Sequence, residues 1–333
     1  MVTTADPARR AALNSLKLRA LVREHLGHDA VEQAGAAVVP FGRGAALVAD
    51  RTAWVLLDEQ PERGLGAALA WLSKQAPVDR LALLTDHSSG LLARRAPLFA
   101  TPIDVWHVVE RLLVPAVTEP HPRAVAVDPK HEPLRELIIA GGAEPLVEHG
   151  VLRGEVRGLE VCRAVTDEFT GEVRLEVGVG AHDREAFLML HGARPTVEAL
   201  SEVAERVRSH REVGVTPHPL NRFGSARFLR WRCLTEPSLI GAASLRPADP
   251  PVVRTNVKDP VPCVAIGTMP DGADVVAVFS TGIDLDLVPF AVDARAMHSP
   301  KAQLTLVVPV RDGSPITRAV AAMAIDPPSL LGL

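Results

Sequence analysis

The spacing of apolar residues changes several times along the N-terminal part of the chain. Between residues 7 and 28, Leu13, Leu16 and Leu21 recur at mostly helical intervals, which predicts an amphipathic helix. Three short apolar runs follow, at 36–41, 45–49 and 53–57, and the pairs Gly42-Arg43 and Arg51-Thr52 separate them. Runs this short with breaks this tight are typical of an antiparallel meander of strands.

Beyond the meander, helical and strand-like patterns alternate up to a proline-rich break. The pattern predicts a buried strand at 81–84 and three helices, over 63–75, 89–97 and 104–113. The segment from Val114 to Arg123 holds three prolines, which indicates a linker or a domain edge. The sequence therefore predicts an N-terminal α/β lobe over residues 1–118.

The middle of the chain continues with strands and helices. The pattern predicts, in order, a strand at 124–127, a helix at 133–140, strands at 155–165 and 173–179, and helices at 182–191, 195–212 and 219–234. We expect residues 119–194 to form a middle α/β segment. Residues 195–333 are expected to hold a helical pair followed by a C-terminal α/β lobe.

The C-terminal part repeats the N-terminal pattern after a proline-rich connector at 247–262. Its predicted elements are strands at 263–268, 274–279 and 303–309 and helices at 285–297 and 314–324. When Pro77 is aligned with Pro300, Leu81 and Leu83 fall on Leu304 and Leu306. Any two stretches with this element order align to some degree by chance, so the repeat is a hypothesis that strand order tests.

Together these patterns predict an α/β fold of two related small mixed-sheet lobes, produced by internal duplication, with a helical pair between them. The ligand sites of such sheets lie at the carboxyl ends of strands.

Composition narrows the class of protein. Hydrophobic residues make up 47% and charged residues 23% of the 333 residues, as in folded globular proteins, and the net charge is only −4. Charged residues interrupt residues 1–30, and no run approaches the roughly 20 apolar residues of a membrane span, so we expect a cytoplasmic protein without a membrane partner. Cysteines 162, 233 and 263 have no metal or disulfide spacing and are expected to be reduced and buried.

The strongest local charge lies between Arg206 and Arg232. This stretch holds seven arginines and one acid, Glu212, interleaved with Phe223, Phe228 and Trp231. Guanidinium groups and rings on neighbouring helices suit phosphates and bases, so the sequence predicts a surface that binds nucleic acid or another protein. Its candidate binding residues are Arg222, Arg227, Arg230 and Trp231. In the other interpretation, this is a helical face whose arginines pair with acids elsewhere and whose aromatic residues face the core. The chain has 31 arginines and five lysines, which weakens arginine as a phosphate signal.

Two aspartates, Asp284 and Asp286, follow a predicted strand and are candidate metal ligands. Carboxylates at such a strand end suit Mg²⁺, the one cofactor that the sequence suggests. In the other interpretation, they cap the start of the following helix. The equivalent positions of the first repeat are Pro61 and Arg63, which excludes a duplicated metal site. The acid- and histidine-rich stretch from His182 to His191 lacks the spacing of a zinc motif and is interpreted as the acidic start of a helix.

Two resemblances add to this picture. The order helix, meander, helix, strand over residues 7–100, with acids in predicted strands, resembles the PD-(D/E)XK nuclease fold in outline, which implies metal-dependent hydrolysis. The acids in question are Asp50, Asp58, Glu160 and Glu176, and the lysine of the Glu-x-Lys motif is absent after Asp58 and Glu176, so the core is a degenerate one. The stretches His218–Arg222, Leu229–Arg232, Pro237–Ala242 and Gly282–Pro289 resemble an uncharacterised protein family of high-GC actinobacteria, which implies a habitat and no activity.

Two functions therefore remain open. The first is a non-enzymatic binding or regulatory protein that uses the arginine and aromatic helical surface. The second is a metal-dependent hydrolase or nuclease-like enzyme that uses clustered carboxylates such as Asp284, Asp286 or Glu176. No P-loop, nucleophile elbow or dinucleotide-binding motif occurs, and the sequence names no catalytic residue.

Overall fold

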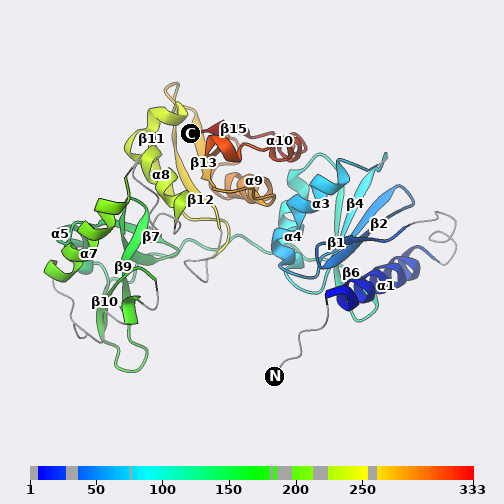
Figure 1. The fold of residues 1–333 in the computed structure, drawn as a ribbon, viewed down its shortest axis with the longest axis horizontal. Coiled ribbons are helices and arrows are strands. Elements are labelled where there is room, and N and C mark those ends of the chain that lie inside the picture. The colour runs from blue at the N-terminus through cyan, green and yellow to red at the C-terminus, as the bar shows by residue number, and fades with distance from the viewer. Residues whose placement is uncertain are drawn as a thin grey trace. The chain divides into compact units, whose positions relative to one another are not determined.

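The computed structural model shows a mixed α/β fold with three sheets, of six, four and five strands (Figure 1). It describes residues 7–27, 37–75, 77–180, 183–185, 197–212, 224–253 and 261–333. The chain divides into two compact units, each of them discontinuous in sequence. Unit 1 comprises residues 1–120, 283–296 and 313–329, and unit 2 comprises residues 121–282, 297–312 and 330–333.

The six-stranded sheet belongs to unit 1 and has the order β1-β2-β3-β4-β5-β6. The first three strands form the expected antiparallel meander, β3, β4 and β5 run parallel, and β6 returns antiparallel to β5. The strands are β1 (Val39–Phe41), β2 (Gly44–Ala49), β3 (Thr52–Leu56), β4 (Arg80–Thr85), β5 (Ile103–Val109) and β6 (Leu112–Pro115).

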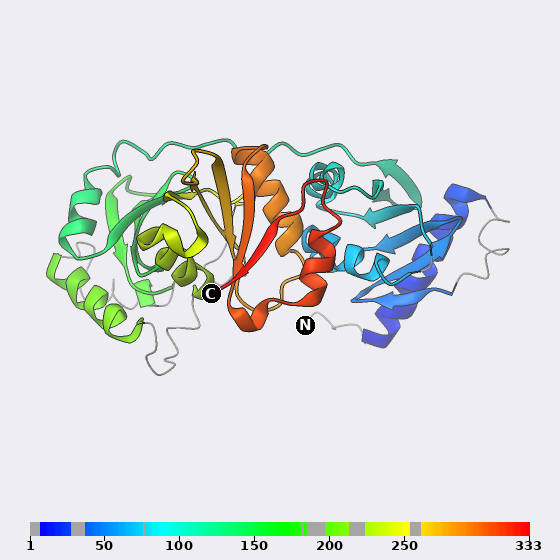
Figure 2. The ribbon, with the colours of Figure 1, turned by 90° about the horizontal axis from the view of Figure 1, so that it is seen from above.

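Helices cover both faces of this sheet, as Figure 2 shows. α1 (Pro7–Leu26) lies on one face, and α3 (Leu65–Leu72) and α4 (Ser89–Arg95) lie on the other. The short 3₁₀ helices η1 (Pro61–Arg63) and η2 (Ala96–Leu98) flank α3 and α4. The α1 face has its own apolar core, which includes Leu18, Leu21, Val22, Leu47, Trp54 and Leu84. Alternation along the strands turns the intervening residues to the opposite face.

The predicted helix at 104–113 is wrong, because this stretch forms the β5–β6 hairpin. Val105 and Val108 are buried, on opposite faces of the sheet, while Val109 is exposed. The turn residue Glu110 has φ 55°, a left-handed conformation that lets a two-residue loop reverse the chain. The stretch is rich in valine, and valine's branched side chain fits a pleated strand better than a helix.

Unit 1 also contains two helices from the C-terminal part of the chain, α9 (Leu287–His298), of which residues 287–296 belong to it, and α10 (Pro315–Ala321). α10 packs against α3, and Phe99 forms an isolated antiparallel bridge with Ala324. Gly66 of α3 lies so close to the backbone of Leu285 that a Cβ atom would sit 1.8 Å from the Leu285 carbonyl oxygen. A glycine is therefore required at this approach.

The four-stranded sheet of unit 2 is antiparallel throughout, in the order β10-β9-β8-β7. Its strands are β7 (Glu144–Glu148), β8 (Val151–Val156), β9 (Leu159–Thr166) and β10 (Val173–Val177). α5 (Leu134–Ala140) and α7 (Val197–His210) pack on one face, around a core that includes Ile138, Leu152, Val161, Leu200 and Ala204.

Two expectations for this sheet need correction, and one strand was missed. The single strand expected at 155–165 is broken at Arg157 and Gly158, whose φ values of 49° and 75° make a tight turn between β8 and β9. The expected strand at 124–127 forms no strand in the structure. Strand β7, within the unassigned stretch after the predicted helix at 133–140, was not predicted.

The five-stranded sheet of unit 2 has the order β11-β12-β13-β14-β15. β11, β12 and β13 are antiparallel and β14 is parallel to β13, which is the arrangement of β1 to β4. The strands are β11 (Ser244–Ala248), β12 (Cys263–Thr268), β13 (Asp274–Phe279), β14 (Gln303–Val308) and β15 (Ser329–Gly332), with the 3₁₀ helix η5 (Val310–Asp312) after β14. Only β11 and β15 were not predicted.

The repeat expected from the sequence has a counterpart in this topology. The offset that places Pro77 on Pro300 also places β4 on the residues of β14, and α3 within α9. Both repeats therefore have the same strand order and the same succession of strands and helices. The second repeat is nevertheless divided, because its strands belong mainly to unit 2 and its helices mainly to unit 1.

The helical pair expected before the second repeat is present in part. α7 matches the helix predicted at 195–212, and α8 (Ser225–Thr235), followed by the 3₁₀ helix η4 (Pro237–Ile240), matches the later part of that predicted at 219–234. Arg222, Phe223 and most of the helix predicted at 182–191 lie outside the described residues. Across the described ranges, none of the helices is long and apolar enough to span a membrane.

Candidate functional site

One face of the four-stranded sheet is polar although it is buried. Leu152 and Val156 of β8 point into the apolar core, so the intervening Arg153 and Glu155 lie on the opposite face. The strand register aligns like charges across this face: Glu144 pairs with Glu155 and Glu155 with Glu160, while Arg153 pairs with Arg163. Like charges directly opposite one another destabilise a sheet, so these rows need compensating charges.

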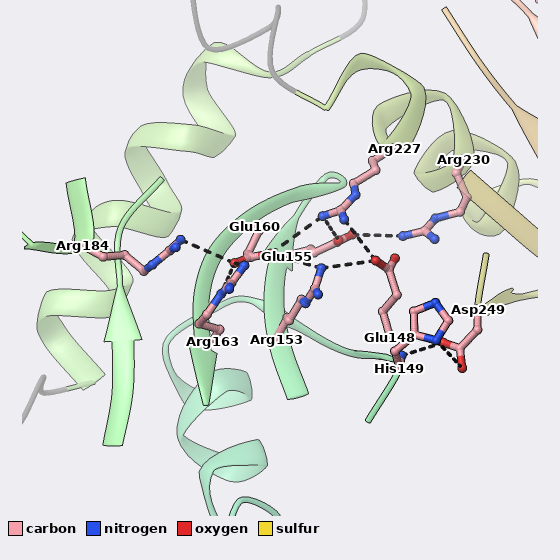
Figure 3. A network of polar contacts seen from close by, with 10 residues as sticks. All are labelled: Glu148, His149, Arg153, Glu155, Glu160, Arg163, Arg184, Arg227, Arg230 and Asp249. Carbon is pink, nitrogen blue, oxygen red and sulfur yellow. Dashed lines mark hydrogen bonds and ion pairs between the residues drawn. The ribbon is translucent and has the colours of Figure 1, made fainter. Parts of the chain in front are cut away.

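α8 supplies the cations for the glutamate row. Arg227 Nη1 donates to Glu155 Oε1 at 3.0 Å, and Arg230 Nη2 donates to Glu155 Oε2 at 3.4 Å. Trp231 Nε1 donates to Glu144 Oε1 at 3.0 Å. Figure 3 shows Arg227 and Arg230 reaching from α8 toward the carboxylates of the sheet. Three of the four residues expected to form a contact surface, Arg227, Arg230 and Trp231, therefore attach α8 to the sheet.

This result corrects the expected exposed surface of arginine and aromatic residues. Arg227 and Arg230 are only 4% and 1% exposed. Arg222 lies outside the described residues. The cause is that their partner acids are strand residues of the facing sheet, which draw the guanidinium groups inward. The alternative interpretation, in which the arginines pair with acids elsewhere, matches the geometry of these two residues.

The aromatic residues of α8 are stacked between arginines. The rings of Phe228 and Trp231 lie 5.7 Å apart and nearly parallel, at 13°. Arg157 Cζ lies 5.6 Å from the centre of Trp231, and Arg211 Cζ lies 5.1 Å from the centre of Phe228. Burial lowers the pKa of Arg211 to about 10, and its Nε and Nη2 groups donate to the carbonyl oxygens of Arg157 and Gly224. The four-layer stack is therefore an internal packing feature, with Trp231 partly exposed at its outer part.

Glu160 is the centre of the second half of this polar face. Its Oε1 atom lies 2.6 Å from Arg163 Nη2 and 3.5 Å from Arg184 Nη1, and its Oε2 atom lies 3.4 Å from Arg153 Nη1. Glu176 Oε2 lies 3.4 Å from Arg184 Nε. Burial lowers the pKa values of Arg153 and Arg184. Glu160 and Glu176, the two glutamates of the nuclease-like outline, therefore both contact arginines, and Arg184 contacts both of them.

Unit 1 contains a smaller ion cluster, which includes one of the two expected metal ligands. Asp293 of α9 accepts two bonds from Arg94, both at 3.0 Å, and one from Arg95 Nε at 3.0 Å. Arg95 Nη1 also donates to Asp286 Oδ2 at 3.0 Å. Burial raises the pKa of Asp286 to about 6, because the loss of water around its carboxylate outweighs the attraction of Arg95.

Asp284 and Asp286 therefore differ from the expected magnesium site. Asp284 Oδ2 lies 2.9 Å from Arg63 Nη2, and its Oδ1 accepts the backbone N–H of Asp286 at 3.0 Å. That second bond is the helix-start role named as the alternative. Arginine occupies the position that a cation would need at each carboxylate. Within the described residues, no group of three or more histidine, cysteine, aspartate or glutamate side chains is placed to hold a metal ion.

The nuclease-like outline also includes two acids in the N-terminal meander, Asp58, which accepts hydrogen bonds, and Asp50, which lies in an exposed turn. Asp58 Oδ2 accepts bonds from Arg10 Nε at 2.7 Å and Asn14 Nδ2 at 3.1 Å. Asp50 lies in the exposed turn between β2 and β3, with φ 48°. All three cysteines are buried, as expected, and none is in a disulfide bond within the described residues. Burial raises the pKa of Cys162 to about 12 and that of Cys233 to about 11.

A cavity of about 540 Å³ lies at the turn between β7 and β8. Val125, Val127, Val151, His131 and His149 are among its lining residues. The His149 backbone N–H donates to Asp249 Oδ1 at 2.8 Å, and the ring Nδ1 lies 3.9 Å from Asp249 Oδ2. The ring Nε2 is buried and has no hydrogen-bond partner among the described residues. Because Nε2 is shielded from water, it does not face the cavity.

Several residues of these clusters were not singled out from the sequence: Glu148, Arg153, Glu155, Arg94, Arg95 and Asp293. Arg153 and Glu155 alternate with apolar residues, and that pattern ordinarily indicates a solvent-facing strand surface. Arg94 and Asp293 are 199 residues apart in the chain.

Comparisons with protein-family models, with curated proteins and with solved structures gave no match for this chain. Its function is therefore argued from the chemistry of its own residues.

Proposed function

We propose that this chain is a non-enzymatic binding protein that docks a partner protein along the β6 edge of its six-stranded sheet. What supports the binding class is the state of the candidate carboxylates. Asp284, Asp286, Glu160 and Glu176 all contact arginines and hold parts of the fold together. Carboxylates used in this way have no open coordination position for a metal or a substrate.

The observation that carries the docking site is the edge strand β6, whose outer side is open within the described sheet. β6 pairs only with β5 and ends the sheet, so one side of its backbone has no strand partner within the described sheet. Natural proteins usually protect such edges with charged residues, and Leu112, Leu113 and Val114 carry none; Pro115, its last residue, offers only partial protection. An extended segment of a partner can therefore continue the sheet by hydrogen bonding to β6.

Exposed apolar side chains on one face of the hairpin add a second contact. Val109 pairs with Leu112 across the two strands, and Leu112 and Val114 are 60% and 44% exposed. Val117, just beyond the strand, is 85% exposed. Leu113 points the other way and packs toward α1. A partner strand with alternating apolar residues would cover these side chains while its backbone pairs with β6.

The test places a photo-crosslinking amino acid at position 112 of the full chain in its native host. A matched control places the same amino acid at Ile325, which is 59% exposed in the same unit. We expect a discrete protein adduct from position 112 and none from position 325. We also expect Val114→Lys to remove that adduct without changing the circular dichroism spectrum, because a lysine on an edge strand opposes pairing.

Three results would contradict this function. The first is an identical set of adducts from both positions, and the second is an adduct that persists in the Val114→Lys variant. The third is an adduct that nuclease treatment removes, which would favour the nucleic-acid partner that the arginine-rich stretch suggested.

A further inference from the structure

The loop that joins β9 to β10 exposes an aromatic side chain completely. Phe169 is 97% exposed, the highest value among the large hydrophobic residues described. The loop lies between two strands of unit 2, at the hairpin of β9 and β10 (Figure 1). Isolated exposed apolar residues are common on protein surfaces, so exposure alone assigns no role to Phe169.

A second observation is that this loop is rigidly constructed. Asp167 Oδ1 accepts the backbone N–H groups of Phe169 at 3.0 Å and Thr170 at 2.9 Å, and Asp167 Oδ2 accepts Arg174 Nη1 at 2.8 Å. These bonds lower the pKa of Asp167 to about 2. Backbone bonds from Asp167 N to Glu172 O and from Gly171 N to Asp167 O, both at 2.9 Å, close the loop. The backbone under Phe169 is therefore ordered before any partner arrives, which reduces the entropy lost on binding.

A third observation is the charge beside the ring. Glu168 and Glu172 flank Phe169 in sequence, are exposed, and make no side-chain hydrogen bond or ion pair within the described part of the chain. The acids of the two buried clusters, in contrast, all contact arginines. Two uncompensated carboxylates beside an apolar ring complement an apolar pocket with lysine or arginine at its rim. They oppose binding to a membrane surface, because anionic lipids repel them.

From these observations, we propose that the Phe169 loop is a second docking site, which inserts its ring into an apolar pocket with a basic rim on a partner protein. This site is in unit 2 and is independent of the β6 edge, so either site can fail its test without affecting the other. Aromatic anchors of this kind carry a large part of the binding free energy at protein interfaces. With an additional site, one chain can hold two partners, or one partner at two points.

The experiment places a photo-crosslinking amino acid at position 169 in the full chain, with Glu205 of α7 as the control position. Glu205 is exposed in the same unit but lies on a helix. We expect an adduct from position 169 alone, whose yield falls at least fivefold between 50 mM and 500 mM NaCl. We also expect the double variant Glu168→Lys, Glu172→Lys to reduce the yield at least tenfold, because the charge complementarity is reversed.

A second measurement separates recognition from folding and identifies the alternative partner. The thermal unfolding midpoints of Phe169→Ser and of the charge-reversed variant should match that of the wild type, because all three side chains are exposed. Vesicles containing 30% phosphatidylserine should not sediment the wild-type chain. An adduct that is insensitive to salt and to charge reversal would overturn the proposal, and so would sedimentation with vesicles that Phe169→Ser abolishes.

Discussion

Two buried clusters of arginines and carboxylates, one in each unit, pair their buried charges in different ways. In unit 1, two arginines face two aspartates, and their buried polar atoms all have hydrogen-bond partners. In unit 2, the ions are shared in a chain of contacts around Glu155 and Glu160. Several buried nitrogens there, among them Arg153 Nε and Arg230 Nε, have no hydrogen bond to any residue that the structure describes. The first cluster is closed and the second is distributed.

This difference indicates which residues of each unit are sensitive to mutation. A buried charge that loses its single partner is costly, whereas a charge with several partners can lose one of them at a lower cost. In unit 1, Asp293 holds both arginines, so the cluster depends on one carboxylate. In unit 2, Glu160 lies within ion-pair distance of four arginines, 153, 163, 184 and 227, so none of these arginines is essential to it alone.

The largest effect is expected for Asp293→Asn. The neutral amide leaves Arg94 without its carboxylate partner and Arg95 with Asp286 alone, and breaking a buried ion pair in this way costs about 3–5 kcal/mol in the free energy of unfolding. Urea denaturation followed by circular dichroism measures the loss. The control is Asp79→Asn, which removes an exposed partner of Arg51 and should leave stability nearly unchanged. A similar, small loss for both variants would show that the closed cluster does not support unit 1.

An intermediate effect is expected from pH, through Asp286. Because burial raises its pKa to about 6, the folded protein binds this proton more tightly than the unfolded chain, whose aspartates titrate near pH ~4. The stabilising contribution is complete below the unfolded pKa and is lost as the pH rises through 6. Between pH 7.5 and pH 5 we expect the wild type to gain about 1.4 kcal/mol relative to Asp286→Asn. Urea titrations of both proteins at the two pH values measure this gain, and a constant difference would exclude it.

The smallest effect is expected for Arg153→Met in unit 2. Methionine fills most of the volume of the arginine stem, Glu160 keeps its contacts with Arg163 and Arg184, and Glu148 keeps its contact with Arg227. We expect the free energy of unfolding to change by less than about 1 kcal/mol, since replacing a buried ion by an apolar residue of similar volume is often neutral. The same substitution at Arg95 in unit 1 provides the comparison. An equal loss at both positions would mean that the two clusters do not differ in this respect.

The sequence allowed much of the local structure to be predicted. The meander, α3, β13 and β14 follow from short-range periodicity, and the repeat alignment placed β4 on β14. The β5–β6 hairpin was missed because a run such as Val105, Val108 and Val109 fits a helical spacing as well as a strand, and only pairing with β4 decides between them.

The ion clusters could not be predicted from the sequence, for a different reason. Arg227 and Arg230 look like surface residues in a stretch with a net positive charge, and nothing near them in the chain reveals that Glu155 lies opposite. Contacts over 72 and 75 residues set their burial. Periodicity reports which face of an element is apolar, but it does not report which polar face will be covered by another element.

The division of the second repeat has a consequence for how the chain is made. Arg94 and Arg95 emerge from the ribosome long before Asp286 and Asp293, and α10, which packs on α3, comes later still. Unit 1 therefore cannot complete its interior during the synthesis of its own sheet, and the two arginines lack the carboxylates of Asp286 and Asp293 until the helices of the second repeat are made. A nascent chain of this kind is vulnerable throughout the interval between the two repeats, and a product terminated within that interval lacks the carboxylates that neutralise these arginines.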